Sequence, residues 1–172
     1  MDVSVPGDVI AGYSLDETLG RGGWAVVYRA HGPGGHPVAL KVLHESHREP
    51  DQLARLQREF DFARRLEHHP NIVTVYDAGP AWLAMELVDG GTISGLATTR
   101  DRLSALTQIA AALDYAHRGG IVHCDVKPAN ILVDKSFTRA VLIDFGVAHS
   151  VSEDVAIRMA HDGGRLTLNP AR

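Results

Sequence analysis

Short alternating runs of apolar residues, separated by glycines, open the chain. Tyr13–Leu19, Trp24–Arg29 and Val38–Leu43 combine β-branched, aromatic and other apolar residues in patterns typical of strands. A Gly-Pro-Gly-Gly sequence at Gly32–Gly35 is typical of a tight turn. We therefore expect three short strands joined by turns in this part of the chain.

The apolar spacing becomes helical after Pro50. Between residues 51 and 66, apolar positions recur at steps of three and four, and Pro50 and Asp51 suit a first helical turn. These apolar positions are Leu53, Leu56, Phe60 and Ala63. Two further strands are predicted at 72–76 and 82–88, before a glycine-rich break at Asp89-Gly90-Gly91.

A second long helix is predicted at Thr99–Arg118, followed by the stop signal Gly119-Gly120. Its apolar stripe is expected to consist of Leu103, Leu106, Ile109 (or Ala110) and Leu113. Two short strands are predicted at 131–133 and 140–143. After Gly146 the periodicity fades, and Ser150–Arg172 is expected to be loop with at most a short helical turn. The pattern predicts an α+β fold with a β-rich part at 1–88 and a helical part at 89–172.

Composition narrows the classes of function. The formal net charge is -4, from 17 Lys and Arg against 21 Asp and Glu, so no basic footprint for nucleic acid or anionic membrane is expected. The only cysteine is Cys124, which excludes an internal disulfide and is typical of a reducing compartment. No secretory signal and no apolar run long enough to span a bilayer is visible. The sequence therefore predicts a cytoplasmic protein.

A glycine-rich segment lies between the first two predicted strands. In Gly20-Arg21-Gly22-Gly23, the missing side chains would let backbone N–H groups approach phosphate oxygens. A plain hairpin turn fits the same residues. Ala25 occupies the position of the third glycine in a Gly-x-Gly-x-x-Gly pattern, so the match to that pattern is incomplete.

Lys41 stands in the middle of an apolar predicted strand, where a charge is unfavourable unless it is paired. Glu59 lies in the helix that follows, and an ion pair between the two would aim the ammonium at phosphate oxygens. The alternative is a lysine that extends from a strand edge into solvent.

The most specific signal is a pair of motifs that follow the second helix. In Asp125-Val126-Lys127-Pro128-Ala129-Asn130, a carboxylate can orient a hydroxyl and accept its proton, and an amide oxygen can ligate Mg²⁺. Lys127 can neutralise a phosphoryl group. Asp144-Phe145-Gly146 follows a short apolar strand and adds a carboxylate suited to Mg²⁺.

In this order, the motifs resemble those of eukaryotic-like Ser/Thr protein kinases of the bacterial type. The resemblance runs from Gly20 to Gly146 and includes Val38-Ala39-Leu40-Lys41, similar to the family's lysine strand. It implies a two-lobed protein-kinase-like fold and phosphoryl transfer from ATP, with Mg²⁺, to Ser or Thr hydroxyls of a protein substrate. It also implies that Asp125 is the catalytic base, that Lys127, Lys41 and Glu59 are catalytic, and that Asn130 and Asp144 bind the metal.

The resemblance further implies an adenine site around Met85-Glu86-Leu87-Val88. Met85 would be the gatekeeper, and backbone groups of Glu86 and Val88 would bind the adenine edge. The remaining residues implied to bind the nucleotide are Leu19, Gly20, Gly22, Val27, Ala39, Lys41 and Leu132.

The chain departs from the family pattern in two places. Cys124 replaces the arginine that commonly precedes the catalytic Asp and pairs with a phosphorylated activation loop, and we expect this cysteine to be a small buried residue. The sequence also ends at Arg172 without an Ala-Pro-Glu motif. It is therefore expected to stop within the activation segment, with an incomplete helical lobe. A second copy or a protein partner is then expected to cover the predicted stripe at Leu103, Leu106, Ile109 and Leu113. The alternative is that Ser150–Arg172 packs onto this stripe.

Two other functions fit the sequence. One is a non-catalytic nucleotide-binding or regulatory module that acts by binding partners. The other is a small-molecule kinase similar to aminoglycoside phosphotransferases, which also place an Asn after a catalytic Asp and use a later metal-binding Asp. Lys127-Pro128 and Asp144-Phe145-Gly146 favour the protein kinases.

Overall fold

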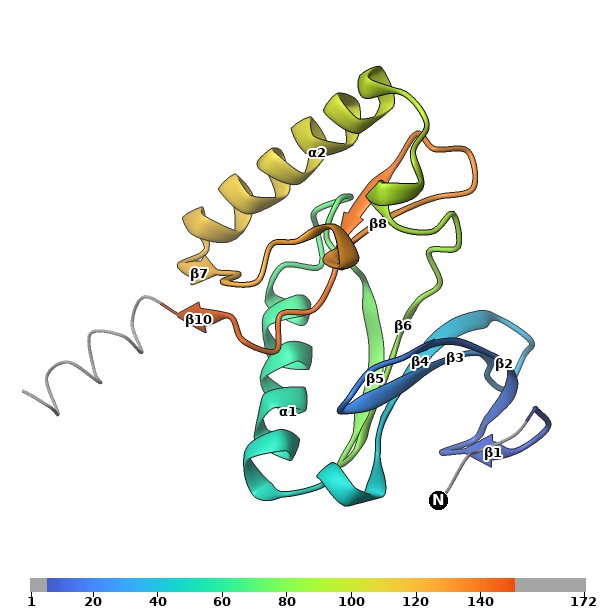
Figure 1. Cartoon of the computed structure of the whole chain (residues 1–172). Helices are drawn as coiled ribbons and strands as arrows, with labels where there is room; N and C mark the ends of the chain where they lie inside the picture. Colours follow the sequence, from blue (N-terminus) through green and yellow to red (C-terminus); the bar gives the residue numbers. More distant parts are fainter. Residues whose placement is uncertain (1–5, 151–172) are drawn as a thin grey trace, which may run out of the picture.

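An antiparallel sheet and one helix form the N-terminal part of the molecule (Figure 1). A computed structural model describes residues 6–150 of the chain. The six strands of this sheet lie in the order β1-β2-β3-β4-β6-β5. Their bounds are β1 Val9–Ile10, β2 Tyr13–Arg21, β3 Ala25–His31, β4 Pro37–Leu43, β5 Val75–Gly79 and β6 Trp82–Glu86. Helix α1 spans Pro50–Arg65 and packs along β5 and β6.

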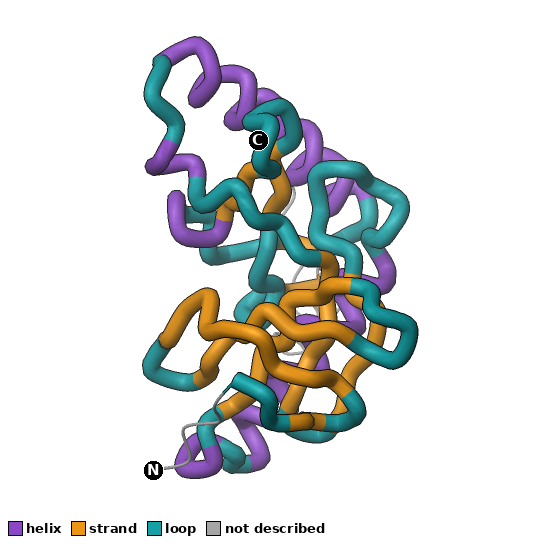
Figure 2. Tube along the Cα trace, turned by 90° about the vertical axis from the view of Figure 1, so that its right-hand side faces the viewer, coloured by secondary structure: helices purple, strands orange, loops and turns teal. Residues whose placement is uncertain are grey.

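The second part of the chain is built around helix α2, Thr99–Arg118. Two small antiparallel pairs pack against it, β7 with β10 and β8 with β9. Figure 2 shows the strands of the large sheet gathered at one end of the molecule and α2 at the other. The remaining bounds are β7 Ile121–Val122, β8 Ile131–Val133, β9 Ala140–Leu142 and β10 His149–Ser150, with 3₁₀ turns at Glu45–His47, Ile93–Gly95 and Pro128–Asn130.

Most of the predicted elements are present, and the differences have local causes. The helix predicted at Thr99–Arg118 is observed with the same bounds. It begins there because the Thr98 hydroxyl accepts a hydrogen bond from the Asp101 amide at 3.0 Å and caps the helix N-terminus. The predicted strand at 72–76 is instead β5, three residues later. The chain at Ile72 forms a parallel bridge with Leu142 of β9 before it turns to pair with β6. The two-residue strands β1, β7 and β10 were not predicted, and residues 151–172, where a loop was expected, lie outside the described residues.

The predicted apolar stripe of α2 is wrong in half of its positions. Leu103 and Leu106 are exposed, with 59% and 48% of their surface accessible. Ile109 is buried, and Leu113 is partly buried against the core. The buried face consists of Ala105, Ile109, Ala112 and Ala116. Small side chains let α2 approach β7 and β9 closely, so the largest apolar residues of the helix do not mark the packed face.

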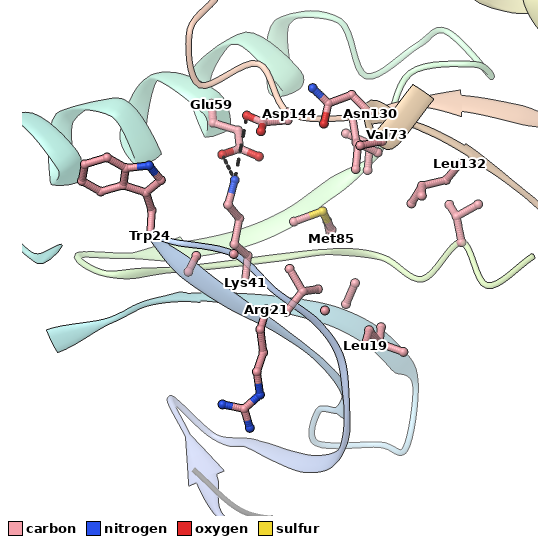
Figure 3. A pocket seen from close by; sticks show the side chains of 18 of the residues that line it. Leu19, Arg21, Trp24, Lys41, Glu59, Val73, Met85, Asn130, Leu132 and Asp144 are labelled. Carbon is pink, nitrogen blue, oxygen red and sulfur yellow. Dashed lines mark hydrogen bonds and ion pairs between the residues drawn. The ribbon is translucent and has the colours of Figure 1, made fainter. Parts of the chain in front are cut away.

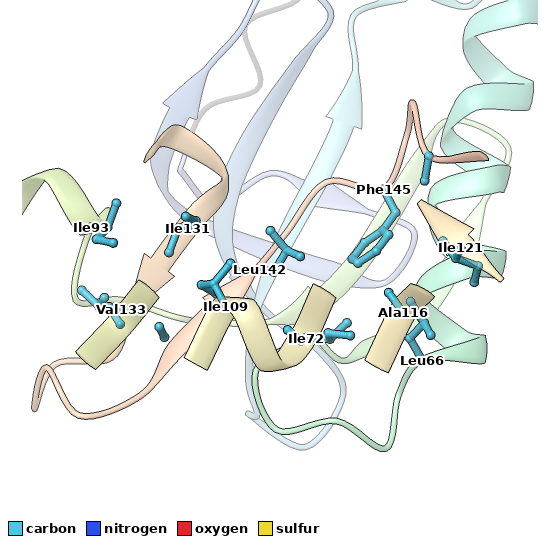
Figure 4. Packing of buried hydrophobic residues seen from close by; sticks show 14 of the residues in the cluster. Leu66, Ile72, Ile93, Ile109, Ala116, Ile121, Ile131, Val133, Leu142 and Phe145 are labelled. Carbon is cyan, nitrogen blue, oxygen red and sulfur yellow. The ribbon is translucent and has the colours of Figure 1, made fainter. Parts of the chain in front are cut away.

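A hydrophobic cluster beneath α2 supports the loops that follow it. Ile109 of α2 lies beside Leu142 of β9, and the same cluster includes Phe145, Ile121 of β7 and Ile131 of β8 (Figure 4). Phe145 and Leu142 are fully buried. This cluster therefore holds the chain in place at and around the Asp144-Phe145-Gly146 motif.

The turn between β8 and β9 is held by one carboxylate. Asp134 accepts hydrogen bonds from the Arg139 and Thr138 amides at 2.9 and 2.8 Å, and from the Ser136 hydroxyl at 2.6 Å. These bonds, that from the Arg139 amide foremost, lower the pKa of Asp134 to about 2. The ionised carboxylate is therefore part of the folded turn.

Asp134→Ala is expected to destabilise the protein by about 1 kcal/mol near neutral pH, because solvent screens the partly exposed carboxylate and limits its contribution. Because the folded pKa lies below the unfolded one, the contribution is present above the unfolded pKa and disappears as pH falls toward about 2. Chemical denaturation at several pH values between about 3 and 7 measures this. Asp134→Asn, which keeps an acceptor for the two amides, is the matched control and should lose less. Equal stability of wild type and Asp134→Ala at neutral pH would contradict the prediction.

Candidate active site

Strand and helix periodicity bring Lys41 and Glu59 together. On β4, Ala39, Lys41 and Leu43 point to the face that packs on α1, because side chains alternate along a strand. On α1, Glu59 shares the buried face with Leu56 one turn before it. The Lys41 Nζ lies 2.6 Å from Glu59 Oε2 and 3.9 Å from Asp144 Oδ1 (Figure 3). The predicted ion pair is thus confirmed, and the strand-edge alternative is excluded.

The pKa values of Lys41 and Glu59 depend on burial and on the charged groups around them. Burial alone would lower the pKa of Lys41, but the carboxylates of Glu59 and Asp144 outweigh burial and raise it. Burial raises the pKa of the Glu59 carboxyl, and Lys41 opposes that effect. Lys41 is therefore a firmly charged ammonium, whereas Glu59 needs its lysine to remain ionised.

A buried histidine shapes the loop that carries Asp125. His123 Nδ1 accepts from the Asp125 amide at 3.1 Å, so its Nε2 carries the proton and donates to the Ile143 carbonyl at 2.8 Å. The ring of His123 also packs edge-on against Phe145, with centroids 4.8 Å apart. One imidazole thus links the Asp125 loop to the Asp144 segment.

Cys124, between His123 and Asp125, is exposed, which corrects the expectation of a buried side chain. Its backbone has a φ of 67°, in the left-handed region. With this turn, the imidazole of His123 lies in the core while Cys124 faces solvent.

Asp125 lies between two groups that donate to it. Lys127 Nζ is 3.2 Å from Asp125 Oδ2, and Asn130 Nδ2 donates to the same oxygen at 3.2 Å and to the Asp125 carbonyl at 2.9 Å. The hydrogen bond from Lys127 is the main cause that lowers the pKa of Asp125. Because its pKa is lowered, the carboxylate is ionised. Its side chain is 31% exposed, so a substrate group can reach it.

Asn130 and Asp144 form an oxygen donor set suited to Mg²⁺. Because the amide nitrogen of Asn130 is directed at Asp125, its amide oxygen points away from that carboxylate. Figure 3 shows the side chains of Asn130 and Asp144 on the same side of the cavity. Asp144 has a φ of 63°, and its Oδ1 accepts from the Gly146 amide at 3.2 Å. One carboxylate and one amide oxygen are hard ligands that fit this metal.

A cavity of about 720 Å³ connects these groups to the sheet. The glycine-rich segment crosses it, with Gly20 opposite Val27 in the β2–β3 ladder and the Gly22 amide donating to Ala25. A Cβ on Gly20 or Gly23 would meet nothing within 4 Å, so open space lies beside this backbone. The predicted residues that line the cavity are Leu19, Gly20, Gly22, Val27, Ala39, Lys41, Glu59, Met85, Glu86, Val88, Asn130, Leu132 and Asp144.

The cavity is also lined by residues that the sequence did not assign to it. Val73 and Ile143 add apolar surface, and Gln52 and Arg55 extend from α1. Gln52 and Arg55 precede Glu59 at helical spacing, and this spacing is the signal that would have identified them. Trp24 also lines the cavity, and its ring packs edge-on against His47 with centroids 4.8 Å apart.

Comparisons with known proteins give one consistent family. The sequence model of the family described as protein kinase domain matches residues 13–164 of this chain. The serine/threonine-protein kinase PknJ of Mycobacterium tuberculosis is 40% identical over 161 residues, which cover 86% of this chain and 27% of PknJ. The probable serine/threonine-protein kinase SCO3848 of Streptomyces coelicolor is 40% identical over 157 residues, covering 82% of this chain and 23% of that protein. The chain therefore spans about a quarter of the length of these relatives.

Solved structures agree with the sequence comparisons. The crystal structure of the PknI kinase domain from Mycobacterium tuberculosis superposes with a TM-score of 0.69 at 35% identity. The match covers 84% of this chain and 62% of that kinase domain. Among the helices of residues 6–150, none is long and apolar enough to cross a membrane.

Proposed function

The chain belongs to the protein kinase family, and we propose that it binds Mg-ATP in the cavity and transfers a phosphoryl group to Ser or Thr hydroxyls of a protein. The observation that carries this proposal is the meeting of Lys41, Glu59 and Asp144 at one end of the cavity, beside Asn130. The proposed compartment is the cytoplasm, where Cys124 would stay reduced.

Each group has a distinct part in the proposed reaction. Lys41, held by Glu59, would contact the nucleotide phosphates, and Asn130 with Asp144 would hold Mg²⁺, which when bound neutralises phosphate charge. Asp125 would accept the hydroxyl proton as the substrate oxygen bonds to phosphorus and the bond to the nucleotide breaks. Lys127, beside Asp125, would stabilise the phosphoryl group in transit.

The adenine end of the site would be apolar. Val27, Ala39, Met85 and Leu132 would enclose the base. The Glu86 amide already donates to the Thr74 carbonyl at 2.9 Å, so a contact from Glu86 to the adenine edge would come from its carbonyl. The amide and carbonyl of Val88 would supply the rest.

The surface proposed for a second copy or a protein partner is smaller than the sequence suggests. Of the four predicted residues, only Leu103 and Leu106 are exposed. Two leucines are far less than the roughly 800 Å² that each partner buries in a stable complex. We propose them only as part of a contact that needs further residues.

Mg-ATP at about 100 times its dissociation constant is expected to stabilise the fold by about 2.7 kcal/mol. For a chain of this size, this corresponds to a rise in melting temperature of about 5–10 °C. Thermal unfolding with and without Mg-ATP measures it, and Asp144→Asn, which weakens the metal site, should show a smaller rise. An unchanged melting temperature with millimolar Mg-ATP would overturn the proposed function. Binding without transfer to any protein hydroxyl would favour the non-catalytic alternative.

A further inference from the structure

An ion pair joins Glu86, the last residue of β6, to Arg139, the residue before β9. Arg139 donates from Nη1 to Glu86 Oε2 at 2.9 Å and from Nη2 to Glu86 Oε1 at 3.0 Å. This paired geometry is the strong, directional form of an Arg–carboxylate contact. The Glu86 side chain is 14% exposed and the Arg139 side chain 36%, so the contact is shielded from solvent mainly on the glutamate side.

Glu86 also forms two hydrogen bonds with Thr74. Its Oε1 accepts from the Thr74 amide at 2.9 Å, and its own amide donates to the Thr74 carbonyl at 2.9 Å. Both the side chain and the backbone of Glu86 are therefore fixed, although the residue lines the cavity.

Arg139 is in turn anchored independently of Glu86. Its Nε donates to the Pro70 carbonyl at 2.7 Å. The next residue, Ala140, donates to Gln108 Oε1 and accepts from Asn71 Nδ2, both at 2.8 Å. The guanidinium thus rests on a framework formed by β9, α2 and the segment before β5.

We propose that Arg139 is a positioning residue for the nucleotide: through Glu86 it fixes the backbone of residues 86–88, to which the adenine edge would bind. The inference rests on the proposed function, since it assigns a role within that site. The guanidinium does not line the cavity, so it acts through Glu86 and not by contact with the nucleotide. A misplacement near 1 Å can slow a reaction by about a hundredfold, and adenine binding needs the backbone of residues 86–88 to be placed with similar accuracy.

The test compares the affinities of variants for adenosine and for Mg-ATP by calorimetry, at a low temperature where circular dichroism shows each variant to be folded. Arg139→Gln is expected to weaken both ligands by about tenfold, equivalent to about 1.4 kcal/mol. Adenosine is the decisive probe because it has no phosphates and reports only on the adenine end. Arg139→Lys and Glu86→Gln, which each keep part of the contact, should lose less.

Arg118→Gln is the matched control, because Arg118 also pairs with a carboxylate, Asp114, but on the exposed side of α2. It should leave both affinities unchanged. Wild-type adenosine affinity in folded Arg139→Gln would overturn the proposal and leave the ion pair a purely structural role. If Arg139→Gln does not fold, unchanged adenosine affinity in both Arg139→Lys and Glu86→Gln would overturn it. Failure of the unmodified chain to bind Mg-ATP would instead overturn the proposed function itself.

Discussion

Asp125→Asn is expected to slow phosphoryl transfer to a protein hydroxyl by about 10²- to 10⁴-fold, the range typical of general acid–base catalysis. The amide that replaces the carboxylate cannot accept the hydroxyl proton. The affinity for Mg-ATP should change little, since Asp125 does not line the cavity. Radiolabel transfer to a generic protein substrate measures the rate, and calorimetry measures the binding.

The pH dependence gives an independent check of this role. Because the hydrogen bond from Lys127 lowers the pKa of Asp125, the carboxylate is already ionised well below neutral pH. Protonation of Asp125 should therefore not reduce the rate between about pH 6 and 8. Asp114→Asn makes the same chemical change on the exposed face of α2 and should leave the rate unchanged. An Asp125→Asn variant with the full rate would show that another group takes the proton.

The sequence was sufficient for the parts of the site that are contiguous in the chain. Asp125, Lys127 and Asn130 lie within one loop, so their proximity follows from the motif itself. Lys41 and Glu59 could be paired because a charge in an apolar strand needs a partner, and Glu59 lies in the helix that follows. The structure places these residues together, while their roles in catalysis stay predictions.

Contacts between segments that are far apart in the chain leave no recognisable pattern in the sequence. Glu86 meets Arg139, and Asn71 meets Gln108, across separations that no local period encodes. The packed face of α2 was misjudged for a related reason. Large apolar side chains such as Leu103 and Leu106 predict a buried face, whereas the neighbouring strands select small residues such as Ala112 and Ala116. Cys124 was misplaced because its exposure results from a positive φ that sequence spacing does not reveal.

Lys41→Met is expected to reduce phosphoryl transfer by more than about a hundredfold, because the ammonium that Glu59 and Asp144 position would no longer meet the phosphates. Lys41→Arg should fail as well. A guanidinium is a planar fork, and it cannot replace a compact ammonium 2.6 Å from Glu59 Oε2.

Lys41→Met should also lose stability, by about 3–5 kcal/mol, because Glu59 would remain buried without its partner. Since burial raises the pKa of Glu59, this carboxyl should take up a proton once Lys41 is removed. A carboxyl with a raised folded pKa binds more protons folded than unfolded, so stability then falls as pH rises. The deficit of Lys41→Met relative to wild type should therefore be smaller near pH 5 than near pH 8.

A double variant separates the loss of stability from the loss of chemistry. Lys41→Met with Glu59→Leu removes both charges, and apolar replacement of a buried pair is often neutral or stabilising. Denaturant unfolding should show much of the stability restored, while radiolabel transfer remains absent. Recovery of transfer in the double variant would contradict the role assigned to Lys41. A Lys41→Met variant as stable as wild type at pH 8 would show that Glu59 does not depend on its lysine, and the buried pair would then be a product of the fold without a part in holding the site.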